Sequence, residues 1–197
     1  MKKGKMKVLT VVMCAVLLVA ISVCGTLAYL TSQDEVVNTF TVGNVKITLD
    51  EAQVDTNGSA ASGASRVESN SYKLIPGSSY TKDPTVHVDA NSEDSWLFVK
   101  VENGIAAIEA AGDTSIAAQM AANGWTLVAG TTNVYAYKNI VKANDNIPVF
   151  ASFKVDGNVK NEVLATYANA QIKVTAYAVQ AAGFDSAAAA WTAAPLS

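Results

Sequence analysis

The amino-acid sequence predicts an all-β fold, a jelly-roll-like β-sandwich with short helical insertions, preceded by an N-terminal signal helix. Three observations support this prediction. From residue 29 onward, short runs of alternating or β-branched residues are separated by turn residues. Helical patterns are confined to a few short alanine-rich segments, and no βαβ rhythm is present. The longest apolar run lies at the N-terminus, directly behind a cluster of lysines.

Residues 1–28 have the layout of a secretory signal peptide. Lysines at positions 2, 3, 5 and 7 precede an almost unbroken apolar run at residues 8–23, and small residues follow at Gly25, Thr26 and Ala28. We therefore expect cleavage between Ala28 and Tyr29. The alternative is a retained membrane anchor, because the apolar run is only slightly shorter than the ~20 residues that span a bilayer.

Cleavage at this point changes the composition of the remaining domain, residues 29–197. Both cysteines of the chain, Cys14 and Cys24, are lost, so the domain must rely on its apolar core and not on disulfides. Four of the 14 basic residues are also lost, which leaves 10 against 17 acidic ones. This acidity argues against nucleic acid or an anionic membrane as a partner.

The predicted strands lie between clear turn signals. A Gly-Asn pair at residues 43–44 separates the first two strands, and a Pro-Gly pair at 76–77 forms a turn before the third. The polar residues 91–94 join the third and fourth strands into an antiparallel hairpin. Residues 55–71 are rich in Ser, Gly, Ala and Asn, which predicts a flexible surface loop. The predicted strands are residues 36–41, 45–49, 85–89, 96–101, 125–128, 134–141, 147–155 and 171–179.

Short helices are predicted in the connections between these strands. Residues 105–111 and 115–122 are rich in alanine, with Asp113 or Thr114 as the N-cap of the second segment and Asn-Gly at 123–124 as its C-terminal stop. A helical turn at residues 161–167 and an alanine-rich helix at 186–192 complete the set.

Three sequence patterns point to a known family. Residues 25–32 read Gly-Thr-Leu-Ala-Tyr-Leu-Thr-Ser, and Asn-Thr-Phe-Thr-Val-Gly-Asn-Val-Lys-Ile follows at 38–47. Leu-Ile-Pro-Gly at 74–77 precedes Lys-Asp and a strand, and Ile-Lys-Val-Thr-Ala-Tyr-Ala-Val-Gln at 172–180 forms a closing strand. In these patterns the chain resembles the TasA/camelysin family of exported Gram-positive proteins, which a SipW-type signal peptidase processes. The first pattern is the most specific, because it combines a cleavage site with a fixed downstream sequence.

The resemblance implies a jelly-roll-like sandwich that assembles into extracellular matrix fibres. In fibre-forming members the freed N-terminal segment pairs with the sheet of the next subunit, which is strand addition to an open edge. In this chain the donor segment would be residues 29–40, with Val36, Val37 and Phe40 inserted into the neighbour. The alternatives are that this segment pairs within its own domain or forms a disordered leader.

The camelysin part of the resemblance also implies a metalloprotease, which the residues do not favour. A common zinc protease needs two histidines at helical spacing with a glutamate between them, whereas this chain has one histidine, His87, on a predicted strand. As a ligand His87 would need Asp89 or Glu93 as a partner, and a strand-paired surface histidine is the simpler interpretation. We therefore assign no catalytic residue, metal ligand or cofactor.

Two binding interpretations are also not favoured by the residues. Asp89, Glu93 and Asp94 crowd one turn but lack the register of a calcium loop, which favours a solvated turn. The three tryptophans at positions 96, 125 and 191 lie on separate predicted elements, which favours packing over a carbohydrate platform.

The sequence as a whole predicts a secreted structural protein of the cell surface or biofilm matrix. Its expected partners are further copies of itself, joined head to tail, or related matrix subunits, together with a dedicated signal peptidase and no nucleic acid. A camelysin-like exported metalloprotease and a monomeric surface binding module are the alternatives.

Overall fold

The computed structural model describes Met13 and residues 44–194. The predicted signal helix at 1–28 and the predicted strand at 36–41 lie outside these residues. The described part from residue 44 onward belongs to one unit of the chain and is considered by itself.

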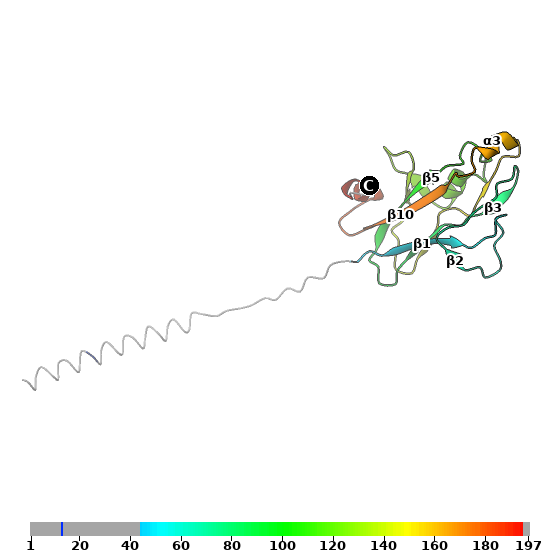
Figure 1. The fold of residues 1–197 in the computed structure, drawn as a ribbon. Helices are drawn as coiled ribbons and strands as arrows, with labels where there is room; N and C mark the ends of the chain where they lie inside the picture. Colours follow the sequence, from blue (N-terminus) through cyan, green and yellow to red (C-terminus); the bar gives the residue numbers. More distant parts are fainter. Residues whose placement is uncertain (1–12, 14–43, 195–197) are drawn as a thin grey trace, which may run out of the picture. The chain divides into compact units, whose positions relative to one another are not determined.

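This part of the chain is mostly β-structure with few helices, so the prediction of a β-rich fold is confirmed (Figure 1). Its helices are α2 (Ile116–Ala122), α3 (Asn161–Ala165) and α4 (Ala187–Ala193). Its strands are β1 (Ile47–Ala52), β2 (Arg66–Val67), β3 (Ser79–Thr81), β4 (Thr85–Val88), β5 (Ser95–Asn103), β6 (Trp125–Leu127), β7 (Val134–Tyr137), β8 (Asn146–Pro148), β9 (Ser152–Lys154) and β10 (Ile172–Gln180).

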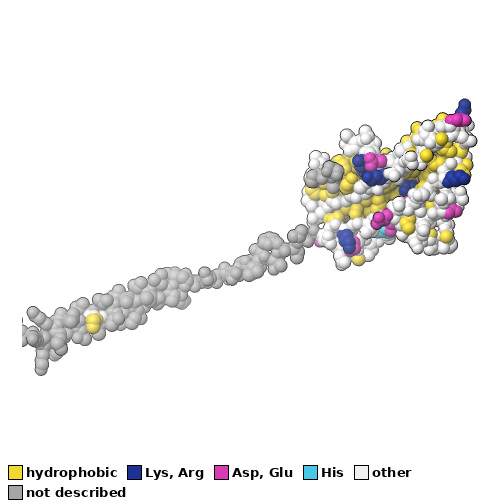
Figure 2. Space-filling model, viewed as in Figure 1, with side chains coloured by type: hydrophobic (Ala, Val, Ile, Leu, Met, Phe, Trp, Pro, Cys, Tyr) yellow, Lys and Arg dark blue, Asp and Glu magenta, His cyan; other side chains and the backbone are white. Residues whose placement is uncertain are grey.

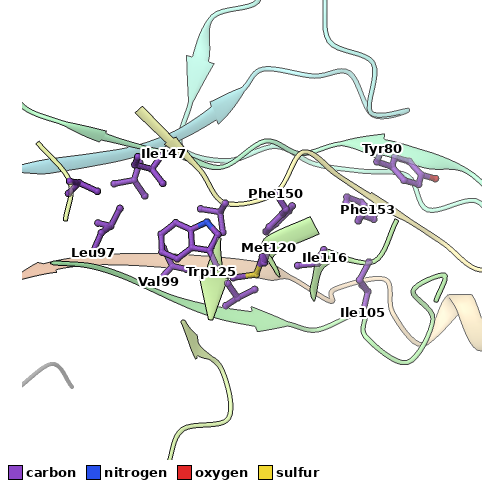
Figure 3. Close-up of a cluster of buried hydrophobic side chains, with 14 of the residues drawn as sticks. Tyr80, Leu97, Val99, Ile105, Ile116, Met120, Trp125, Ile147, Phe150 and Phe153 are labelled. Atoms are coloured by element: carbon purple, nitrogen blue, oxygen red, sulfur yellow. The ribbon is translucent and has the colours of Figure 1, made fainter. Parts of the chain in front are cut away.

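The strands form three antiparallel sheets. One four-stranded sheet has the order β2-β1-β4-β8 and the other has the order β10-β5-β7-β6, while β3 and β9 form a two-stranded sheet. Side chains from both four-stranded sheets meet in one core, which Figure 3 shows between two layers of strands. The arrangement is therefore sandwich-like.

The central strand β5 shows why the sequence folds this way. Leu97 and Val99 are fully buried in the main core, and Phe98 between them is fully buried in a second cluster. Because successive side chains of a strand point to opposite faces, β5 must be covered on both sides. Helix α4 provides the second cover, since the ring of its Trp191 lies 5.1 Å from that of Phe98.

The predicted hairpin of residues 85–89 and 96–101 is wrong. Both segments are strands, but β4 pairs with β1 and β8, whereas β5 pairs with β10 and β7. The polar turn between them carries the chain from one sheet to the other, where the N–H of Ser95 donates to the carbonyl of Val141. Two apolar alternating strands look the same in sequence whether they pair side by side or face each other across a core.

Four other predictions differ in detail from the structure. Residues 105–111 form turns instead of a helix, with Ile105 and Ile108 buried in the core and an isolated bridge at Glu109. The run 147–155 is two strands, β8 and β9, in different sheets. The N-cap of α2 is Ser115, whose hydroxyl accepts from the N–H of Ala118, and not Asp113 or Thr114. The predicted loop at 55–71 contains the short strand β2.

Candidate functional site

A groove between β1 and β10 is the candidate functional site. The two strands approach each other at one side of the molecule (Figure 1). Among the described residues, β10 pairs with β5 alone, and β1 pairs with β2 only at Glu51 and Ala52. Both strands therefore present a free edge toward the same gap.

The free edge of β1 is defined by the direction of its backbone groups. The N–H of Asp89 donates to the carbonyl of Lys46 at 3.0 Å, so the even-numbered residues of β1 bond toward β4. Hydrogen-bonding direction alternates along an antiparallel strand. Ile47 and Leu49 consequently direct their N–H and C=O groups away from β4.

The same parity argument applies to β10. The N–H of Gly104 donates to the carbonyl of Gln171, and the N–H of Ala181 donates to that of Asp94, each at 2.8 Å. Odd-numbered residues therefore bond toward β5, and the even-numbered residues from Ile172 to Gln180 direct their backbone groups outward. β10 thus offers a nine-residue strand with one open side.

The side chains at these edges leave part of the core uncovered. Those that pack against the core yet stay partly exposed are Ile47, Leu49, Ile172, Val174, Ala176 and Ala178. Leu49, Ile172 and Val174 line a hollow with a volume of about 880 Å³, whose lining also includes residues 68–74, Leu164 and residues 167–171. Figure 2 shows hydrophobic side chains gathered along this face.

One end of the groove is polar and contains a buried ion pair. Lys82 Nζ lies 2.5 Å from Glu51 Oε2, and the two side chains are only 12% and 4% exposed. Asn70 donates through Nδ2 to Glu51 Oε1 at 2.9 Å and to the carbonyl of Ala52 at 2.8 Å. Asn70 Oδ1 in turn accepts from the N–H of Val54 at 2.9 Å.

Tyr72 forms the apolar wall beside this ion pair. Burial, followed by the negative charge of Glu51, raises the pKa of the Tyr72 phenol. Its hydroxyl donates to the carbonyl of Thr81, and its ring makes edge contacts with Tyr80 and Phe153. The phenol therefore stays protonated and serves as a hydrogen-bond donor.

A second polar cluster holds β2 against β1 and β4. Arg66 donates from Nε to Asp50 Oδ1 and from Nη1 to Asp83 Oδ2, each at 2.7 Å. Burial of Arg66 opposes its charge, but its hydrogen bonds to the carboxylates of Asp50 and Asp83 raise its pKa. His87 completes the cluster through Asp50 and Asn146.

The sequence-predicted processing and donor residues lie outside the part of the chain that the structure describes. They are Ala28 and Tyr29 for processing, and Val36, Val37 and Phe40 for the donor segment.

His87 is on a strand, as predicted, but its ring contacts Asp50 and Asn146 and not the suggested partners Asp89 and Glu93. Within the described part of the chain, no group of three or more His, Cys, Asp or Glu side chains could hold a metal ion.

The acidic turn and the tryptophans are used in packing and local bonding. Asp89 accepts from Lys46 Nζ at 3.1 Å and from the N–H of Asn91 at 3.0 Å. Trp125 is buried in the main core, whereas Trp96 and Trp191 belong to the second cluster. The three indoles therefore share no common surface.

The sequence analysis missed the polar end of the groove. Glu51, Asn70 and Lys82 come from three separate segments. The only sequence signal for them is a charged or amide side chain within each segment. No helix among residues 44–194 is long and apolar enough to cross a membrane. Comparisons with known protein families, with curated proteins and with solved structures gave no match to this chain.

Proposed function

We propose that this chain is a secreted structural protein of the cell surface or biofilm extracellular matrix of a Gram-positive bacterium. The observation that carries the proposal is the groove, where two open strand edges flank an uncovered part of the core. Open edges pair readily with an added strand. The signal-peptide layout of residues 1–28 and the TasA-like patterns support the same proposal.

The occupant of the groove would be residues 29–40 of another copy, freed by a dedicated signal peptidase that cuts between Ala28 and Tyr29. Main-chain hydrogen bonds to the open edges would supply affinity, and alternate side chains would fill the hollow. The two-residue period of a strand places Val36 and Phe40 on one face and Val37 on the other. Val36 and Phe40 would then enter the core, while Val37 would point outward.

Such an addition joins subunits head to tail and need not close. The groove belongs to one copy and the donor segment to the next, so the product would be a fibre of this chain or a mixed fibre with related matrix subunits. The same segment could instead fill its own groove, which would give a self-complemented monomer.

The jelly-roll topology is part of this proposal. The connections from β4 to β5 and from β7 to β8 each pass from one four-stranded sheet to the other. Crossing connections of this kind are typical of two-sheet jelly rolls and Greek-key sandwiches. A donor strand would extend the open edge of β10 or of β1.

The proposal is tested with chain processed after Ala28, compared with the same chain lacking residues 29–40. We expect filaments by electron microscopy from the first and monomers from the second. A synthetic peptide of residues 29–40 should bind the shortened chain. Identical filaments from both chains would show that the segment is not the link.

A pair of substitutions to glutamate tests the groove itself. Val174→Glu places a charge in the groove lining on β10, whereas Ala188→Glu places the same charge on an exposed position of α4. We expect the first to abolish filaments and the second to leave them intact. Incubation with casein, with and without a chelator, addresses the protease alternative, because chelator-sensitive cleavage would contradict a purely structural role.

A further inference from the structure

An amine, an amide and a carboxylate meet at the polar end of the groove. Glu51 presents one carboxylate oxygen to Lys82 Nζ at 2.5 Å and the other to Asn70 Nδ2 at 2.9 Å. Glu51 itself is 3% exposed. The three side chains come from β1, the loop after β2 and the residue that follows β3, so the fold brings together groups that are far apart in sequence.

From this arrangement we infer that Lys82 and Asn70 join in an intramolecular isopeptide bond, with Glu51 as the group that transfers the protons. The inference does not rest on the proposed function, because the bond lies within one chain. Amide formation needs an uncharged amine, a carbonyl carbon held nearby and an acid for the leaving group. Glu51 contacts both the Lys82 amine and the Asn70 amide, so one carboxylate links the two groups that would react.

The contact between Lys82 and Glu51 supplies the first requirement. Passing one proton from the Lys82 ammonium to the Glu51 carboxylate leaves two neutral groups. The 2.5 Å contact is the path for that proton. The lone pair on Nζ is then free to attack Asn70 Cγ, which forms the new carbon–nitrogen bond.

The remaining steps balance without any added reactant. As Nζ attacks, negative charge develops on Asn70 Oδ1, which already accepts the N–H of Val54 at 2.9 Å. Glu51 gives its proton to Nδ2 and takes one from Nζ. The bond from Cγ to Nδ2 breaks, one ammonia leaves, and a secondary amide links the two side chains.

The bond would hold the groove wall in place. It would close the segment between residues 70 and 82, which includes Tyr72 and Leu74 of the groove lining. Residues 29–197 contain no cysteine, so no disulfide can provide such a link there. A covalent side-chain amide would supply the constraint in its place.

Intact mass spectrometry of the folded full-length protein tests the inference. We expect a mass about 17 Da below that of the sequence, because one ammonia is lost in this acyl transfer. Trypsin should leave residues 67–73 joined to residues 74–100, since cleavage after the modified Lys82 is blocked. A folded protein with the full sequence mass would overturn the inference, whatever the behaviour of any variant.

Variants distinguish the ammonia lost when this bond forms from ammonia lost elsewhere in the chain. Lys82→Met and Glu51→Gln should both restore the full mass, whereas Lys154→Met should keep the loss. Asn70→Asp should lose about 18 Da from its own sequence mass, because water replaces ammonia as the leaving group. Succinimide formation at Asn57-Gly58 gives the same loss as the wild-type bond, so a loss that persists in Lys82→Met would refute the assignment.

Discussion

Asp50 on β1 and His87 on β4 are joined by a hydrogen bond of 2.8 Å between Oδ1 and Nε2. The same oxygen accepts from Arg66 Nε at 2.7 Å, so one carboxylate connects β1, β2 and β4. Burial opposes the charge of Asp50, but the hydrogen bonds from His87 and Arg66 lower its pKa below the usual value of 3.8. Asp50 is therefore ionised more readily in the folded chain than in the unfolded one.

This lowered pKa predicts a specific loss of stability in acid. A carboxylate with a lowered folded-state pKa contributes stability above its unfolded pKa and loses it as the pH falls through the folded pKa. Asp50→Asn should lower the free energy of unfolding by about 1–3 kcal/mol at neutral pH, the usual range for hydrogen bonds to a charged group. Denaturant unfolding from pH 7 down to about pH 2 should show a shallower decline for the variant than for the wild type.

Asp113→Asn is the control for this measurement. Asp113 is exposed in the turn before α2, so its replacement should leave the pH profile close to that of the wild type. Parallel declines for wild type and Asp50→Asn in acid would contradict the role assigned to the Asp50 hydrogen bonds.

Gly58 packs so closely on Tyr80 that it cannot gain a side chain. Its φ is +78°, and a Cβ at this position would lie 2.7 Å from the Tyr80 Cα atom. Tyr80 is 1% exposed and its hydroxyl bonds Lys73 and Ile75, so it cannot move aside. Gly58→Ala should therefore lower the free energy of unfolding by more than about 2 kcal/mol.

Gly63→Ala provides a matched comparison. Its φ is +72°, but nothing lies within 4 Å of the added Cβ. We expect a cost of about 1 kcal/mol from the backbone conformation alone. The difference between the two variants in urea unfolding measures the clash with Tyr80, and equal costs would show that no clash exists.

An element can be predicted from sequence when the residues of that one segment are enough to specify it. β10 was expected at 171–179 and spans Ile172–Gln180, because its side chains alternate over the whole strand. The helix expected at 105–111 is absent because alanine propensity is a weak preference, and the turns there bury Ile105 and Ile108 in the core. Tertiary packing decided that segment.

The groove could not be predicted in the same way. It depends on which strands end up at the sheet edges, and the strand order β10-β5-β7-β6 is set by contacts between distant segments. Its polar end depends on Glu51, Asn70 and Lys82, whose sequence surroundings show no common motif. An edge strand and a central strand of similar composition differ in their neighbours, not in their own residues.

Glu109 caps α2 from a distance in sequence, which yields a third prediction. Its Oε1 accepts from the N–H of Ile116 at 2.6 Å, and its Oε2 accepts from Asn103 Nδ2 at 2.8 Å. In Glu109→Gln the charge is lost and one acceptor becomes a donor, so the free energy of unfolding should fall by about 1–3 kcal/mol. Thermal unfolding measures this loss. Glu162→Gln, an exposed change on α3, should leave the unfolding transition nearly unchanged.

Trp125 provides a fourth prediction, because it combines burial with a hydrogen bond inside the core. It is 3% exposed, its ring lies 5.2 Å from that of Tyr137, and its Nε1 donates to the carbonyl of Pro148 at 3.0 Å. In Trp125→Phe the carbonyl at the end of β8 loses its donor and a void remains beside it. We expect a loss of about 2–4 kcal/mol in the free energy of unfolding.

The matched change is Trp191→Phe on α4, which removes an indole from the second cluster. Trp191 is only partly buried and its contacts to Phe98 and Tyr177 are between rings, so phenylalanine can keep much of the packing. The free energy of unfolding should fall by only about 1 kcal/mol in Trp191→Phe. Circular dichroism during urea unfolding measures both variants on the same signal. A larger cost at Trp191 than at Trp125 would mean that α4 contributes more to stability than the Trp125 to Pro148 hydrogen bond and its surrounding core.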